Sequence, residues 1–146
     1  MSTVNKIRAA TVDDAVAVAA LSSELGYPQS AAEAAARLRR LLAQDDDLVL
    51  VAEAAHGSVA GWVHAHYSVL LAVAPYVDIK GLIVSASQRG QGFGKALTDA
   101  VADWARARGA QEVTVRSRME RTEAHAFYES RGFVLRKQSK VLVKRL

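Results

Sequence analysis

The stretch Ser87-Gln88-Arg89-Gly90-Gln91-Gly92-Phe93-Gly94-Lys95 decides how the rest of this chain is interpreted. It follows the apolar segment Leu82-Ile83-Val84 and precedes apolar residues at helical spacing, so the sequence predicts a strand, a glycine-rich loop and a helix in succession. Glycines on alternate positions let the backbone approach an anion closely, and the first N–H groups of the helix point toward it. Arg89 and Lys95 add positive charge at the rim. The loop therefore predicts a phosphate cradle.

Two better-known phosphate loops do not fit this stretch. The Rossmann pattern G-x-G-x-x-G does not match, because Gly94 comes only two residues after Gly92 and a third glycine at the required spacing is missing. A Walker A loop needs glycine where Arg89 stands and Ser or Thr where Ala96 stands. The pattern that does fit is R-x-x-G-x-G.

Working outward from the loop, the sequence predicts alternating strands and helices in the order β-α-α-β-β-β-α-β-α-β. We find no internal repeat and no linker, which favours one mixed α/β domain over residues 1–146. The strands are expected at 7–9, 48–54, 59–67, 76–84, 112–115 and 133–143, the last as a strand or a hairpin. The helices are expected from caps at Thr11 and Ser30, from Gly92 to Gly109, and over 122–130.

Composition excludes several classes of protein. The 146 residues, 51% of them hydrophobic, suit one globular core, and the absence of cysteine excludes disulfides, thiolate metal sites and cysteine nucleophiles. A net charge of +4 suits an anionic ligand, and a cytoplasmic location is expected. The uncharged stretch 54–77 contains histidines, glycines and strand-like alternation, so we expect a strand and a loop there, with no membrane span or secretory signal.

A second motif, Ala124-His125-Ala126-Phe127-Tyr128-Glu129-Ser130-Arg131-Gly132-Phe133, follows the glycine-rich loop. The two motifs together resemble the GCN5-related N-acetyltransferase superfamily, and the resemblance spans nearly the whole chain. It implies a mixed, mostly antiparallel sheet flanked by helices, in which two strands splay apart to form an acyl-CoA cleft. It also implies an acetyl-CoA-dependent N-acyltransferase.

The resemblance implies roles for residues on the cofactor side. The pyrophosphate of acetyl-CoA is expected at Arg89, Gly90, Gln91, Gly92, Phe93, Gly94 and Lys95, and the pantetheine arm along the main chain of Leu82, Ile83 and Val84. Arg121 stands where the family often has asparagine, and an arginine there is suited to a phosphate or a pantetheine carbonyl.

The acid and the base of the reaction have different support. Tyr128 matches the family's general acid, which protonates the departing thiolate; its alternative is a core aromatic that shares a helix face with Ala124 and Phe127. Asp78 is the expected base, acting directly or through water; its alternative is a solvated strand residue paired with Lys80.

His64 and His66 compete with Asp78 for the role of base. An H-x-H pair on a strand places both imidazoles on one face, suited to relaying protons or to binding zinc. A third ligand with suitable spacing is not evident, so we interpret the pair as a strand face turned to the acceptor cleft and expect no metal.

The acceptor is expected to be a small-molecule amine resembling an aminoglycoside, a polyamine or an amino acid. The alternatives are a protein amine as acceptor, a silent acyl-CoA sensor, and a nucleic-acid-binding domain. Neither nucleic acid nor a membrane is expected as a partner. The arginines at 106, 108, 116, 118 and 121, which could attract nucleic acid, lack interleaved aromatics and are interpreted as a solvated face. The apolar loop Leu70 to Ala74 suits either a cover for the acceptor or a homodimer contact.

Overall fold

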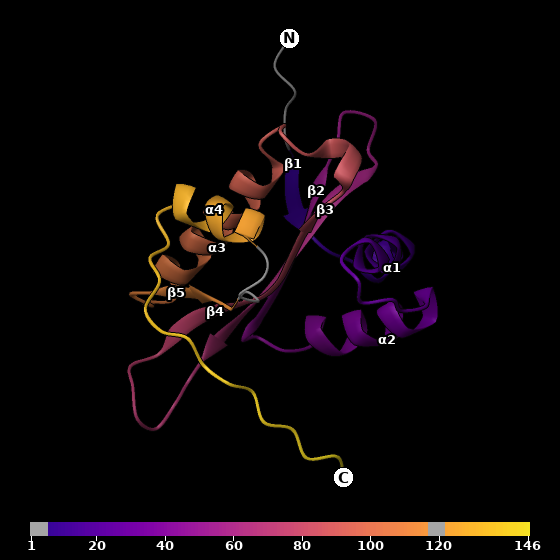
Figure 1. The fold of residues 1–146 in the computed structure, drawn as a ribbon. Helices are drawn as coiled ribbons and strands as arrows, with labels where there is room; N and C mark the ends of the chain where they lie inside the picture. The colour runs from indigo at the N-terminus through magenta and orange to yellow at the C-terminus, as the bar shows by residue number, and fades with distance from the viewer. Residues whose placement is uncertain (1–5, 117–121) are drawn as a thin grey trace. The chain divides into compact units, whose positions relative to one another are not determined.

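The computed structural model describes residues 6–116 and 122–146 (Figure 1). The chain divides after Arg116 into two compact units, and each is described by itself. The prediction of a single domain stays a prediction.

The first unit is built on a five-stranded sheet with the order β1-β2-β3-β4-β5. β1 to β4 pair antiparallel in sequence order, and β5 pairs parallel with β4. This is the mixed, mostly antiparallel sheet that was predicted. The strands are β1 (Lys6–Ala9), β2 (Asp47–Glu53), β3 (Val59–Ser68), β4 (Tyr76–Val84) and β5 (Val113–Val115).

Helices cover both faces of this sheet (Figure 1). A short 3-10 turn, η1 (Val12–Asp14), leads into α1 (Ala15–Glu24), which lies with α2 (Ala31–Leu42) on one face. A second 3-10 turn, η2 (Ala86–Gln88), leads toward α3 (Phe93–Ala107) on the other face. The predicted capping box opens α2, because the Glu33 amide donates to Ser30 Oγ at 3.0 Å and the Ser30 amide donates to Glu33 Oε1 at 2.9 Å.

The core follows from the two-residue period of the strands. Val49 and Val51 of β2 pack with Val18, Ala34 and Leu38 of α1 and α2. On α3, the side chains spaced three or four residues apart are fully buried, as an amphipathic helix requires; they are Phe93, Leu97 and Val101.

The second unit contains α4 (Thr122–Ser130) and a tail. The amides of Arg131 and Phe133 both donate to the Tyr128 carbonyl at 3.0 Å, and Gly132 has a φ of +88°, so the helix ends where the glycine was expected to stop it. The strand predicted over 133–143 is wrong, because residues 133–146 have no regular secondary structure. A strand needs a hydrogen-bonded neighbour, and the described residues of this unit offer none.

Among the described residues, no helix is both long and apolar enough to cross a membrane.

An ion-pair network joins the first strands to the start of α1. The Arg8 guanidinium donates to both carboxylate oxygens of Asp14, at 2.8 and 2.9 Å, and to Glu53. The Thr11 amide also donates to Asp14, whose side chain is 7% exposed. The hydrogen bonds from Arg8, with that from Thr11, hold the pKa of Asp14 below its usual value.

Replacing Asp14 by asparagine should lower the free energy of unfolding by about 2 kcal/mol at pH 7, since charge-assisted hydrogen bonds are lost. A carboxyl whose pKa is depressed by folding stabilises above its unfolded pKa, about 3.9, and loses that contribution as the pH falls through its folded value. Thermal unfolding should therefore separate wild type from Asp14→Asn at pH 7, and the difference should shrink below about pH 4. Asp13→Asn, which changes an exposed carboxylate one residue earlier, is the control.

Candidate active site

The glycine-rich loop joins the end of β4 to the start of α3. After η2 the backbone is extended at Arg89, and then Gly90 and Gly92 take φ values of +81° and +83°. This left-handed region favours glycine, because a Cβ there approaches the following carbonyl. Phe93, which is 1% exposed, anchors the first turn of α3 in the core. The sequence therefore needs glycine at these two positions to turn the chain directly into the helix.

This arrangement can hold an anion. Gly92 is the N-cap of α3, and the first intrahelical bond runs from the Ala96 amide to the Gly92 carbonyl. The amides of the residues before Ala96 lie in the first turn of the helix. They have no intrahelical acceptors and lie at the positive end of the helix dipole. Arg89, Gly90 and Gln91 are exposed. A diphosphate therefore fits the loop chemically.

The Lys95 side chain has a partner that the loop motif did not predict. Its Nζ lies 2.7 Å from Asp99 Oδ2, one helical turn further along α3, and both side chains are more than half exposed. An exposed pair of this kind contributes little to stability and exchanges readily with an incoming anion.

The predicted pantetheine segment, Leu82 to Val84, lies beyond the end of the pairing between β4 and β5. Ile79 pairs with Val115, the last residue of β5, whereas β4 continues to Val84 with β3 along its other edge. In the described part of the chain, the edge of β4 after Ile79 therefore has no strand beside it. An extended ligand can pair with such an edge as an added strand would.

Asp78 is buried in the sheet with two hydrogen-bond donors. Lys80 Nζ donates to Oδ2 at 2.7 Å and Thr114 Oγ1 donates to Oδ1 at 2.6 Å, while Asp78 is 2% exposed. The alternative interpretation of Asp78 was therefore right about the pairing with Lys80 and wrong about solvation. Both carboxylate oxygens of Asp78 thus already accept a hydrogen bond, and its burial leaves little room beside it for an acceptor amine.

His64 and His66 share one carboxylate. Asp47 Oδ1 lies 2.8 Å from His64 Nε2 and 3.0 Å from His66 Nδ1, and the Asp47 side chain is 4% exposed. Sequence reasoning missed Asp47, because it closes the acidic run Asp45-Asp46-Asp47 just before the strand expected at 48–54. The available signal was the alternation of Asp47 with Val49 and Val51, which places all three on one face of a strand.

The sheet register lines up these polar residues across four strands. Residues directly opposite each other share a face of the sheet. The row formed in this way consists of Asp47 on β2, His66 on β3, Asp78 on β4 and Thr114 on β5. We call these four residues the polar row.

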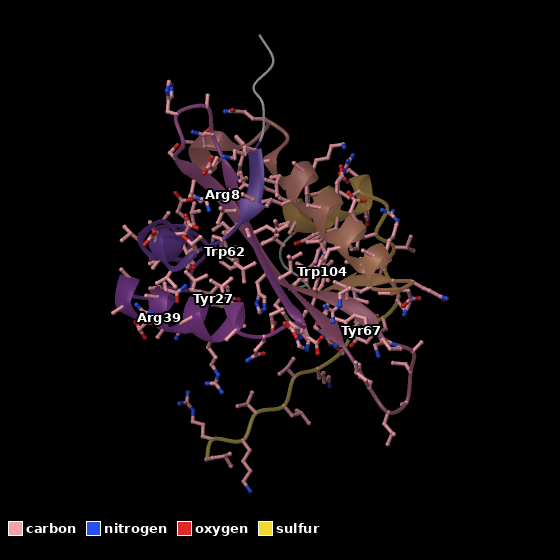
Figure 2. All side chains as sticks on the ribbon, turned by 180° about the vertical axis from the view of Figure 1, so that it is seen from behind. Arg8, Tyr27, Arg39, Trp62, Tyr67 and Trp104 are labelled. Atoms are coloured by element: carbon pink, nitrogen blue, oxygen red, sulfur yellow. The ribbon has the colours of Figure 1, made fainter. Side chains whose placement is uncertain are left out.

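A pocket of about 170 Å³ lies on the α1 and α2 side of the sheet. Its walls are mostly apolar side chains from α1, α2 and β2, and β3 contributes Trp62 and His64. Trp62, labelled in Figure 2, extends over Gly81, where an added Cβ would come within 2.8 Å of the indole. The buried Trp62 Nε1 has no hydrogen-bond partner in the described part of the chain. The pocket thus combines an apolar wall with the imidazole of His64 and the ring of Trp62.

The other aromatic and basic candidates are engaged elsewhere. Arg108 lies 4.5 Å from the centroid of the Tyr67 ring and 5.0 Å from that of Trp104, and it donates to Asp46 (Figure 2). Arg106 pairs with Asp103. Arg118 and Arg121 lie outside the described residues.

Two further features are exposed at the surface, namely Tyr27 and the loop between β3 and β4. Tyr27 is 52% exposed and does not line the pocket. The loop between β3 and β4 exposes Leu70, Leu71 and Val73, as a contact loop would, and its partner stays a prediction. Within residues 6–116 and 122–146, no group of three His, Cys, Asp or Glu side chains is arranged to hold a metal ion.

Tyr128 lies on α4 in the second unit and is partly buried. Its ring makes edge contacts with Phe127 and Phe133, with centroids 5.3 and 5.4 Å apart. The aromatic packing that was the alternative to catalysis is therefore present, and it leaves a role for the hydroxyl open.

Comparisons with known proteins agree with this architecture. The sequence model of the Acetyltransferase (GNAT) family matches residues 15–133. An aminoglycoside N(6')-acetyltransferase type 1 from Stenotrophomonas maltophilia is 34% identical over 131 residues, which cover 87% of this chain and 84% of that protein.

Solved structures share the fold. Aminoglycoside N-acetyltransferase AAC(6')-Iy in complex with CoA gives a TM-score of 0.87 at 21% identity, covering 100% of this chain and 98% of that one. Aminoglycoside 6'-N-acetyltransferase AAC(6')-Ih from Acinetobacter baumannii gives 0.84 at 19% identity, covering 97% and 99%.

The chain belongs to the GNAT acetyltransferase family. It is an acetyl-CoA-dependent N-acyltransferase, as its two motifs predicted.

Gly90→Ala tests the loop against a matched control. Gly90 has a φ of +81°. Gly57, which lies in the turn between β2 and β3, has a φ of +79°, and an added Cβ meets nothing within 4 Å at either position. Alanine should therefore strain both positions by a similar amount, roughly 1–2 kcal/mol. Only Gly90→Ala should weaken acetyl-CoA binding, by about tenfold or 1.4 kcal/mol, measured by isothermal titration calorimetry. Equal affinities in the two variants would remove the loop from the binding site.

Proposed function

We propose that this protein transfers the acetyl group of acetyl-CoA to the primary amine of a small molecule. The observation that carries the proposal is the loop from Arg89 to Lys95, whose two left-handed glycines lead the chain into the N-terminus of α3. Such a loop suits a diphosphate, and it follows, after η2, the part of β4 that has no strand beside it in the described residues.

On the donor side, residues 89–95 bind the pyrophosphate, and the main chain of Leu82, Ile83 and Val84 pairs with the pantetheine arm. An N–H of Ile83 or Val84 then stabilises the oxyanion that forms as the amine attacks the thioester carbonyl. Arg121 is proposed to contact the cofactor by its place in the sequence.

On the reaction side, Tyr128 protonates the thiolate that leaves as the C–S bond breaks. A phenol has a reference pKa of about 10, so it carries its proton at neutral pH. Asp78 is the carboxylate that the family resemblance puts forward as base, provided that Lys80 or Thr114 releases it.

The acceptor class is proposed from the relatives. The Stenotrophomonas maltophilia relative and the AAC(6') structures are named as aminoglycoside acetyltransferases, which supports an amine on a small molecule. Polyamines and amino-acid-like amines belong to the same proposed set. A cytoplasmic location and a homodimer are also part of the proposal.

Thermal unfolding with and without acetyl-CoA tests cofactor binding, because a ligand at one hundred times its Kd stabilises by about 2.7 kcal/mol. A thiol-release assay over a panel of aminoglycosides, polyamines and amino acids then tests turnover. Stabilisation without turnover would favour the sensor, and an affinity for nucleic acid that falls steeply with salt, without an acetyl-CoA effect, would favour the nucleic-acid-binding alternative.

Tyr128→Phe should lower kcat by about 10²-fold, the size of effect typical of a lost general acid, while leaving acetyl-CoA affinity nearly unchanged. The substitution keeps the ring that packs against Phe127 and Phe133, so folding should be preserved. Tyr76→Phe, at the start of β4, is the control and should leave kcat unchanged. A wild-type kcat in Tyr128→Phe would exclude the tyrosine from the proton transfer.

A further inference from the structure

The imidazole of His64 is held by a buried carboxylate and lines the pocket on the α1 and α2 side of the sheet. Its Nε2 lies 2.8 Å from Asp47 Oδ1. Because a carboxylate accepts and does not donate when ionised, His64 carries its ring proton on Nε2, and Nδ1 keeps the lone pair. A base whose second nitrogen is fixed by a carboxylate is the arrangement found where an imidazole takes protons from a substrate.

The pocket offers few other groups that can take a proton. Among the described residues that line it, the titratable side chains are His64 and Arg37. A guanidinium keeps its proton, so it cannot act as a base. His64 is 21% exposed, whereas Asp78 is 2% exposed with both carboxylate oxygens engaged. Of the two candidate bases, His64 and Asp78, His64 is therefore the one that a ligand can reach.

His64 also lies next to the proposed donor site. It pairs across β3 and β4 with Gly81, the residue that directly precedes Leu82. The pocket wall and the segment proposed to bind pantetheine are therefore on neighbouring strands.

We propose that His64 accepts the proton of the acceptor ammonium and that Asp47 positions His64 for this step. The proposal rests on the acetyl transfer proposed above and identifies its base. Asp78 then has a structural role in the polar row, in which the Lys80 ammonium neutralises its carboxylate and the Thr114 hydroxyl holds it by a hydrogen bond.

The proton balance of the step is complete. His64 Nδ1 takes one proton from R–NH₃⁺, and the neutral amine forms a C–N bond to the acetyl carbon. The tetrahedral intermediate then breaks its C–S bond. Tyr128 gives its proton to the departing CoA sulfur, the second proton lost by the nitrogen restores the phenol, and His64 returns its own proton to solvent.

The titratable and charged groups around His64 come from three elements. Asp47 of β2 lies against its Nε2, His66 of β3 shares that carboxylate, and Arg37 of α2 lines the same pocket. β4 contributes Gly81 opposite, and α1 lines the pocket with Val18. Lys80 is paired with Asp78.

The first arm of the test reads the tautomer and does not depend on activity. In protein labelled with ¹⁵N-histidine, at about pH 8 where imidazoles are mostly neutral, long-range ¹H–¹⁵N spectra distinguish the two ring nitrogens. His64 should carry its proton on Nε2 and His66 on Nδ1. In Asp47→Asn this preference of His64 should weaken. A His64 proton on Nδ1 in the wild type would overturn the proposal.

The second arm is kinetic and uses His64→Gln, with His56→Gln in the exposed turn between β2 and β3 as control. For an accepted amine, kcat should fall by about 10²-fold in His64→Gln, and the acidic limb of the pH dependence of kcat/KM should disappear. The control should keep both the rate and the limb. Asp47→Asn should move the same limb, which a merely structural role would not do.

The outcomes separate the two proposals. If the wild type acetylates no amine in the panel, the proposed function fails and the role of His64 fails with it. If the wild type is active and His64→Gln keeps its rate and acidic limb, only the role of His64 fails. A loss that is greater in Asp78→Asn than in His64→Gln, with folding intact in both, would return the role of base to Asp78. Acetyl-CoA stabilisation should be equal in wild type and His64→Gln.

Discussion

Strand β4 extends beyond the described end of β5, its parallel neighbour, and the arrangement of the candidate site depends on that difference in length. Among the described residues, β4 pairs with β5 as far as Ile79 and continues to Val84 with β3 along its other edge. Backbone N–H and C=O groups require hydrogen-bond partners, so a strand edge without a neighbouring strand can bind an extended ligand. The glycine-rich loop begins where this edge ends, and the His64 pocket lies one strand away.

The polar row places the buried carboxylates of Asp47 and Asp78 within the sheet, where removing a charge from water costs free energy. A buried carboxylate is tolerated when hydrogen bonds replace its water, and Asp47 and Asp78 each have two partners. Apolar residues at these positions would satisfy the sheet more simply. Such departures from simple packing concentrate at functional sites, which is why the polar row and its neighbour His64 are of interest here.

The sequence predicted local features well and cross-strand partners poorly. The Ser30 capping box, the bounds of the first five strands to within one residue, and the turn into α3 follow from patterns within a few residues, and the structure has them. Asp47 could not be connected with His64 and His66, because their contact depends on the register between β2 and β3. The strand expected over 133–143 failed for a related reason: β propensity does not supply a neighbouring strand.

The contact between Gly81 and Trp62 gives the protein a way to vary what it accepts without altering any reacting group. A methyl group at residue 81 would meet the indole at 2.8 Å and displace one wall of the pocket. In the pocket proposed for the acceptor, the available space is thus set by a backbone position of β4. A substitution at this glycine would therefore reshape the pocket while the donor loop stays the same.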